Sequence, residues 1–144
     1  AGLATTRARI EQYIAAERAQ GIDARRIVLA GFSQGGATAL HVGLRRAERL
    51  AGIIALSCYL PLRDRLATEA VGANRDTPIL MCHGREDVVV LPAFGEMSRD
   101  ALLAAGLPVE WRAYPMGHNL CRPEIFDIAA WLRYHLALDP ASNP

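Results

Sequence analysis

Short apolar runs recur along this chain at spacings that leave room for a helix between them. The runs at residues 26–30, 53–56 and 78–82 are continuously or almost continuously apolar. Runs of this length and composition are typical of strands that are buried on both faces of a parallel sheet. A fourth segment, residues 109–114, alternates more between apolar and polar positions and favours an edge or outer strand.

Amphipathic segments separate these runs. Helical periodicity or helix boundary signals predict helices over residues 3–20, 34–46, 92–105 and 123–136. Residues 57–77 form a long irregular stretch, and a connection of this length is either functional or a partial helix. In the last helix one apolar stripe is expected to face the core, namely Ile125, Ile128, Ala129, Leu132 and Leu136. This order favours an α/β fold with a mostly parallel sheet and helices on both faces.

The length of 144 residues suits one domain, expected over residues 1–136, with a frayed tail over residues 137–144. A hydrophobic fraction of 51% is enough for a packed core, and no apolar run approaches the roughly 18 residues of a membrane-spanning helix. The net charge of +1 argues against a nucleic-acid-binding protein. No signal-peptide pattern opens the chain, which favours a cytoplasmic protein, with a leader in an absent upstream part left open.

All 16 basic residues are arginines, so chemistry that needs a lysine, such as a Schiff base or a Ser-Lys dyad, is excluded. The three cysteines, Cys58, Cys82 and Cys121, are odd in number and lack a C-x-x-C spacing. They predict neither a disulfide framework nor a zinc site, and nothing else in the sequence asks for a metal or a cofactor.

A glycine-rich turn follows the first apolar run. Residues 31–35, Gly-Phe-Ser-Gln-Gly, match G-x-S-x-G between a predicted strand and a predicted helix, which is the context that this nucleophile motif requires. Small residues at positions 31 and 35 are expected to let the chain double back, so that Ser33 projects from the carboxyl edge of the sheet. The alternative is a tight turn with an incidental serine.

A serine nucleophile needs a base and an orienting acid. Of the four histidines, His118 follows the last strand in a turn-forming loop at the same sheet edge as Ser33. His83 ends the third apolar run and suits either a site or a structural turn, while His41 lies too far along its helix and His135 is expected at the surface.

For the acid, Asp87 lies just past the third strand, and the order Ser33, Asp87, His118 is the one expected of an α/β-hydrolase. Glu86, expected to point to solvent, and Asp64, in the loop after the second strand, are weaker alternatives for the acid.

Five segments together resemble the phospholipase/carboxylesterase family of α/β-hydrolases, which includes acyl-protein thioesterases. They are residues 26–37 (RIVLAGFSQGGA), 55–61 (ALSCYLP), 83–90 (HGREDVVV), 114–118 (YPMGH) and 125–132 (IFDIAAWL). Cys58 stands where this family often has glycine, and Val88 where it often has proline. The resemblance runs from about residue 10 to residue 136.

The resemblance implies a serine hydrolase of carboxylic esters or thioesters that works through an acyl-enzyme without metal or cofactor. By matching position, Ser33 is the nucleophile, His118 the base and Asp87 its orienter. The backbone N–H of Gln34 is then one oxyanion donor, and Leu60, Val88 and Val89 lie near where the family places acyl-binding side chains. The implied substrate is a small ester or a lysophospholipid-like molecule.

The sequence departs from the family upstream of Ser33. Family members carry an earlier strand and a His-Gly-rich loop that supplies a second oxyanion N–H, and residues 1–25 contain only a predicted helix and turn. We therefore expect the N-terminal part of the family fold to be absent and the strand ending at Ala30 to be an exposed edge. The alternative function is a non-catalytic fragment that folds only with a partner or as a homo-oligomer. Peptidase or acyltransferase chemistry on the same triad is a further alternative.

Overall fold

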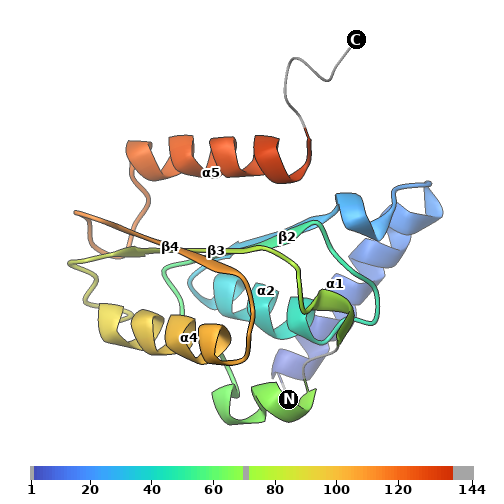
Figure 1. The fold of residues 1–144 in the computed structure, drawn as a ribbon, viewed down its shortest axis with the longest axis horizontal. Coiled ribbons are helices and arrows are strands. Elements are labelled where there is room, and N and C mark those ends of the chain that lie inside the picture. The colour runs from blue at the N-terminus through green and yellow to red at the C-terminus, as the bar shows by residue number, and fades with distance from the viewer. Residues whose placement is uncertain (1, 70–71, 138–144) are drawn as a thin grey trace.

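The computed structural model describes residues 2–69 and 72–137, and its centre is one parallel sheet (Figure 1). The strands are β1 (Val28–Phe32), β2 (Gly52–Leu56), β3 (Ile79–Gly84) and β4 (Val109–Tyr114). They lie side by side in chain order, and each neighbouring pair is parallel. This arrangement confirms the predicted α/β class, and β1 and β3 each run two residues beyond the sequence prediction, to Phe32 and Gly84.

Helices cover both faces of the sheet (Figure 1). On one face lies α5 (Arg122–His135), and on the other lie α2 (Gln34–Leu44) and α4 (Pro92–Ala104). Helix α1 (Gly2–Ala19) packs beside α2. The long connection after β2 holds three short turns of helix, η2 (Arg63–Arg65), α3 (Leu66–Glu69) and η3 (Gly72–Asn74), so the predicted irregular stretch is partly helical.

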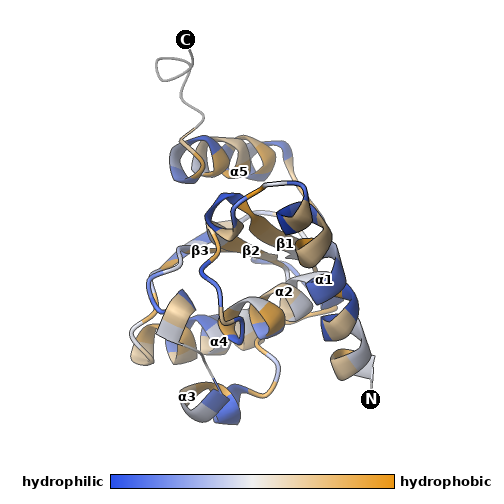
Figure 2. Ribbon diagram, turned by 90° about the vertical axis from the view of Figure 1, so that its right-hand side faces the viewer, coloured by the Kyte–Doolittle hydropathy of each residue, from blue (hydrophilic) through white to orange (hydrophobic). Residues whose placement is uncertain are grey.

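Two apolar clusters hold these layers together. One lies between the sheet and helices α2 and α4 and includes Leu40, Ile53 and Leu102, each fully buried. The other lies between the sheet and α5 and is built around Leu80 and Trp131. Figure 2 shows the hydrophobic colouring of the central strands between these helix layers. Because strand residues alternate between the two clusters, a one-residue slip of register would exchange the contents of both cores.

Helix α5 corrects one detail of the sequence prediction. Ile125 was placed in the core-facing stripe, but its side chain is 54% exposed, whereas Glu124 and Trp131 are buried. Ile128 and Leu132 of the predicted stripe do pack against the core, so the prediction fails at Ile125. At the helix start, the buried Glu124 accepts a hydrogen bond from the backbone N–H of Cys121 (3.4 Å).

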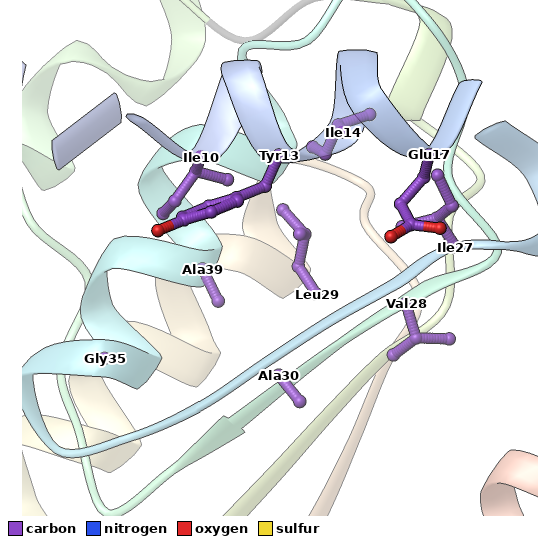
Figure 3. Close-up of a pocket in the computed structure, with 10 residues that line it drawn as sticks. All are labelled: Ile10, Tyr13, Ile14, Glu17, Ile27, Val28, Leu29, Ala30, Gly35 and Ala39. Carbon is purple, nitrogen blue, oxygen red and sulfur yellow. The ribbon is translucent and has the colours of Figure 1, made fainter. Parts of the chain in front are cut away.

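Strand β1 forms one edge of the described sheet and pairs only with β2, as expected. Along it, α1 leaves a cavity of about 310 Å³ that Ile10, Tyr13 and Ile14 line from the helix and Leu29 lines from the strand. Figure 3 shows these α1 side chains above the strand. Within the described residues no helix is long and apolar enough to cross a membrane. Residues 138–144 of the predicted frayed tail lie outside the described part of the chain.

Candidate active site

The turn between β1 and α2 holds Ser33 in an uncommon backbone conformation. Its φ of 57° and ψ of −119° lie in a region that L-residues rarely adopt. The strand ends at Phe32 and the helix begins at Gln34, so the whole reversal is made at one residue. The backbone N–H of Ser33 donates to the carbonyl of Leu56 at 2.7 Å, which fixes the turn against β2. Such local strain is characteristic of functional positions.

Two glycines make this reversal possible. A Cβ at Gly31 would overlap the backbone of Gly35 and Gly36, and a Cβ at Gly36 would lie 2.9 Å from Cys58 Sγ. A Cβ at Gly35 would meet nothing within 4 Å. Residue 35 therefore need not be small for the chain to double back, contrary to the prediction. Crowding requires glycine at positions 31 and 36.

The acid candidate lies in the loop after β3. Asp87 is 2% exposed, and its Oδ1 accepts hydrogen bonds from the backbone N–H groups of Val89 and Val90, both at 2.9 Å. These two donors leave Oδ2 to face His118, whose Nδ1 lies 2.8 Å away. The loop thus fixes both oxygens of the carboxylate.

His118 connects the acid to the serine. Its Nδ1 faces Asp87 and its Nε2 lies 3.0 Å from Ser33 Oγ. The imidazole comes from the loop between β4 and α5, 85 positions after the serine. Because parallel strands end at one edge of the sheet, the ends of β1, β3 and β4 bring the three side chains together.

The charge state of Asp87 determines which nitrogen of His118 carries the proton. Burial raises the pKa of Asp87, but hydrogen bonds from His118 and from the Val90 and Val89 N–H groups outweigh it and hold the pKa below its usual value. The carboxylate is therefore ionised at neutral pH and can only accept hydrogen bonds. Nδ1 of His118 must then carry the hydrogen, which leaves Nε2 as the acceptor for the Ser33 hydroxyl.

An electropositive position lies next to the serine oxygen. Gln34 is the first residue of α2, so its backbone N–H has no acceptor within the helix. The helix macrodipole adds partial positive charge at the same end. An oxyanion that forms beside Ser33 would be stabilised there. The elements before β1 in the described part of the chain are α1 and η1 (Ala24–Arg26), joined by a turn, as the sequence predicted where the family carries its earlier strand and loop.

Asp87 lies in the loop of residues 85–90 (the acid loop), and His118 lies in the loop of residues 115–121 (the base loop). Backbone hydrogen bonds join these two loops to each other. The N–H of Arg85 donates to the carbonyl of Tyr114 at 2.8 Å, and the N–H of Glu86 donates to that of Met116 at 3.1 Å. Gly84 permits this approach, since a Cβ there would overlap the carbonyl oxygens of Met116 and Gly117. Asp87 and His118 are therefore carried by one hydrogen-bonded unit.

The two alternative acids differ from Asp87 in burial. Glu86 is exposed, as expected, and so is Asp64. Of the residues considered for substrate binding, Leu60 is buried in the core on the α2 side, whereas Val88 and Val89 are 83% and 67% exposed on the acid loop. The two valines thus present an apolar surface close to Asp87.

The other histidines do not contact the serine. His41 is buried within α2, where burial and Arg45 lower its pKa. His135 is half-buried rather than a surface residue, and it packs against the ring of Trp131. His83 is 1% exposed and lies beside the acid loop.

Phe32 contributes to the site without having been predicted from the sequence. Its ring packs against the imidazole of His118, with centroids 4.8 Å apart. The available signal was its place in the motif, because the residue before the serine ends the strand at the same sheet edge. Phe32 thereby limits how far the imidazole can turn.

The described residues contain no cluster of three or more His, Cys, Asp or Glu side chains that could hold a metal ion. Cys58 and Cys82 are buried, and burial raises the pKa of each thiol to about 12. Neither thiol is therefore activated as a nucleophile.

The sequence profile of the phospholipase/carboxylesterase family matches residues 1–136. Among curated relatives, acyl-protein thioesterase 1 of Neurospora crassa is 45% identical over 140 residues, which are 94% of this chain and 57% of the relative. The protein of the same name from Yarrowia lipolytica is 35% identical, over 94% of this chain and 61% of the relative. The chain thus spans a little over half the length of the curated relatives it matches.

Solved structures share the fold. SOBER1 of Arabidopsis thaliana superposes with a TM-score of 0.88 at 30% identity, over 93% of this chain and 64% of that protein. Acyl-protein thioesterase 2 of Zea mays gives a TM-score of 0.69 at 32% identity, over 74% of this chain and 55% of that one.

Proposed function

The chain belongs to the phospholipase/carboxylesterase family, and we propose that it is a serine hydrolase that cleaves carboxylic esters or thioesters through an acyl-enzyme. One observation carries the proposal. A single imidazole lies 3.0 Å from a serine Oγ on a strained turn and 2.8 Å from a buried, ionised carboxylate. This is the geometry that nucleophile activation requires.

In the acylation step Ser33 Oγ attacks the carbonyl carbon of the substrate, and the hydroxyl proton passes to Nε2 of His118. The carbonyl electrons move to the oxygen, which the backbone N–H of Gln34 stabilises. When the tetrahedral intermediate collapses, the bond to the alcohol or thiol breaks, and the leaving group takes the proton from Nε2. The ionised Asp87 stabilises the imidazolium that exists between these two transfers.

Deacylation repeats the same sequence with water in place of the serine hydroxyl. Nε2 of His118 takes a proton from the water, the hydroxide attacks the acyl carbon, and Ser33 Oγ leaves with that proton. Removal of one oxyanion donor typically lowers turnover by about 10² to 10³-fold, whereas the triad contributes on the order of 10⁶. With the Gln34 N–H as the oxyanion donor, the chain should therefore have measurable hydrolase activity.

For the substrate we propose an acyl chain on a small alcohol, a lysophospholipid-like headgroup or a thiol. The exposed side chains of Val88 and Val89 lie on the acid loop, and Leu91 and Phe94 are about half-exposed just beyond it. Burial of such apolar surface against an acyl chain would contribute about 25 cal/mol per Å². The curated relatives named acyl-protein thioesterase 1 support the thioester among these choices.

The test is covalent labelling of the full 144-residue chain with a fluorophosphonate probe, followed by peptide mapping. We expect label on Ser33, loss of label and of p-nitrophenyl butyrate hydrolysis in Ser33→Ala, and no label after heat denaturation. Circular dichroism of each sample establishes that it is folded. A folded wild-type chain that stays unlabelled would refute the proposal.

The alternative of a non-catalytic fragment receives no support from the relatives' names. The labelling test also decides it, because such a fragment would keep Ser33 unlabelled in the folded state. A panel of chromogenic esters and thioesters of increasing acyl length would then define the substrate class.

A further inference from the structure

A second histidine lies against the acid loop, outside the contacts used in the proposed reaction. His83 is the next-to-last residue of β3 and is 1% exposed. Its Nε2 lies 2.8 Å from the carbonyl oxygen of Val90 and 3.5 Å from Asp87 Oδ2. The first distance is a hydrogen bond and the second is too long for one.

The partner fixes the direction of this bond. A backbone carbonyl can only accept, so Nε2 of His83 carries the hydrogen and donates it to Val90. The bond joins the end of β3 to the far end of the acid loop. The backbone N–H of the same Val90 donates to Asp87 Oδ1. One residue therefore receives the histidine's hydrogen bond and gives its own to the acid.

The ring of His83 is held on two further sides. It stacks on Trp111 of β4, with centroids 5.9 Å apart and planes inclined by 19°. On α4, Gly95 leaves the space that the ring fills, since a Cβ there would lie 2.6 Å from Nδ1. A ring confined in this way directs its Nε2–H in one direction only.

From these contacts we propose that His83 is a positioning residue for the proposed hydrolysis. Its Nε2–H anchors Val90, the Val90 N–H then holds Asp87 Oδ1, and Oδ2 is thereby aimed at Nδ1 of His118. This inference rests on the proposed function and assigns to His83 a role transmitted through Asp87. The direct separation of 3.5 Å makes the loop, rather than a bond between His83 and Asp87, the route of that effect.

The experiment compares variants that differ in the donor. His83→Gln can present an amide N–H near the position of Nε2, whereas His83→Leu fills a similar volume without a donor. Glu96→Gln, an exposed change on the neighbouring helix α4, is the matched control. For each we would measure kcat and KM for p-nitrophenyl butyrate, and the folded fraction by circular dichroism.

We expect His83→Leu to lower kcat by roughly 10- to 100-fold, the range that a displacement of about 1 Å produces. KM should change little, because the loop would still present its valines to the acyl chain. His83→Gln should retain most of the activity, and Glu96→Gln all of it.

The decisive readout is the same substitution in an Asp87→Asn background, followed by the rate of fluorophosphonate labelling. A role through Asp87 predicts that His83→Leu lowers the labelling rate strongly in the wild type and by less than about twofold in the Asp87→Asn protein. An equal loss in both backgrounds would overturn the inference, as would a wild-type kcat for His83→Leu.

A second pair keeps the test open if His83→Leu fails to fold. His83→Asn carries its amide nitrogen close to the Nδ1 position, away from Val90, so it should lose activity where His83→Gln does not. The reverse order would contradict the proposal. A failure of the proposed function is distinguishable, because the wild-type chain itself would then remain unlabelled.

Discussion

Asp87→Asn should remove nearly all activity without a comparable loss of stability. In the structure Oδ1 of Asp87 accepts hydrogen bonds from the N–H groups of Val89 and Val90. The asparagine must therefore keep its carbonyl oxygen at that position, because an NH₂ group cannot accept. Its NH₂ group then faces Nδ1 of His118 and donates to it.

The consequence for the base follows from that donation. Nδ1 of His118 becomes an acceptor, so the hydrogen moves to Nε2, and the nitrogen that faces Ser33 Oγ at 3.0 Å can no longer take the serine proton. Forcing the wrong tautomer of a triad histidine typically lowers kcat by about 10⁴-fold, which corresponds to about 5 kcal/mol in the activation free energy.

The assay is hydrolysis of p-nitrophenyl butyrate from pH 5 to pH 10, with the fluorophosphonate labelling rate as an independent measure. Urea unfolding of the same samples reports stability. If Asp87→Asn kept more than about 1% of the wild-type kcat at neutral pH, the argument that the backbone fixes the amide orientation would be refuted.

Three further predictions concern residues other than Ser33, Asp87 and His118. Gly84→Ala should lower kcat by about 10²-fold, because the added Cβ would displace the loop that carries His118. The control is Gly72→Ala, where a Cβ meets nothing within 4 Å. Equal kcat values for the two variants would contradict the prediction. Burial raises the pKa of Glu124 more than its hydrogen bond from the Cys121 N–H lowers it, so the wild type should lose unfolding free energy as pH rises above 4.5, the ordinary pKa of this carboxyl. Glu124→Gln should abolish that loss in urea titrations between pH 4 and pH 8. An unchanged dependence of the unfolding free energy on pH would refute the prediction. Iodoacetamide at pH 8 should alkylate Cys121 well before the buried Cys58 in the native protein, as peptide mapping would show, and faster modification of Cys58 would rule this out.

The fold could be predicted from the sequence because two signals indicate each strand, namely the length of its apolar run and the signal that follows it. Each apolar run is short enough to exclude a long helix and is followed by a turn or helix signal, so the α/β class and the mostly parallel sheet could both be predicted. The residues at which the strands end could not be predicted. β3 continues through His83 and Gly84, because pairing with β4 continues to Tyr114, a tertiary contact that local composition does not encode.

The three residues of the candidate site were predictable for a related reason. Parallel strands end at one edge, so Ser33, Asp87 and His118 had to lie near each other once each was placed after a strand. What sequence could not provide was their support. The bonds from Val89 and Val90 to Asp87, and the packing of Phe32 on His118, depend on loop conformations that no short pattern specifies.

Backbone hydrogen bonds between the loops after β3 and β4 make the acid and the base a single mechanical body, while the serine is attached two strands away. A displacement of β1 relative to β3 would thus change the separation between Ser33 and His118 and leave that between His118 and Asp87 nearly constant. A ligand that contacts both β1 and β3 would oppose that displacement.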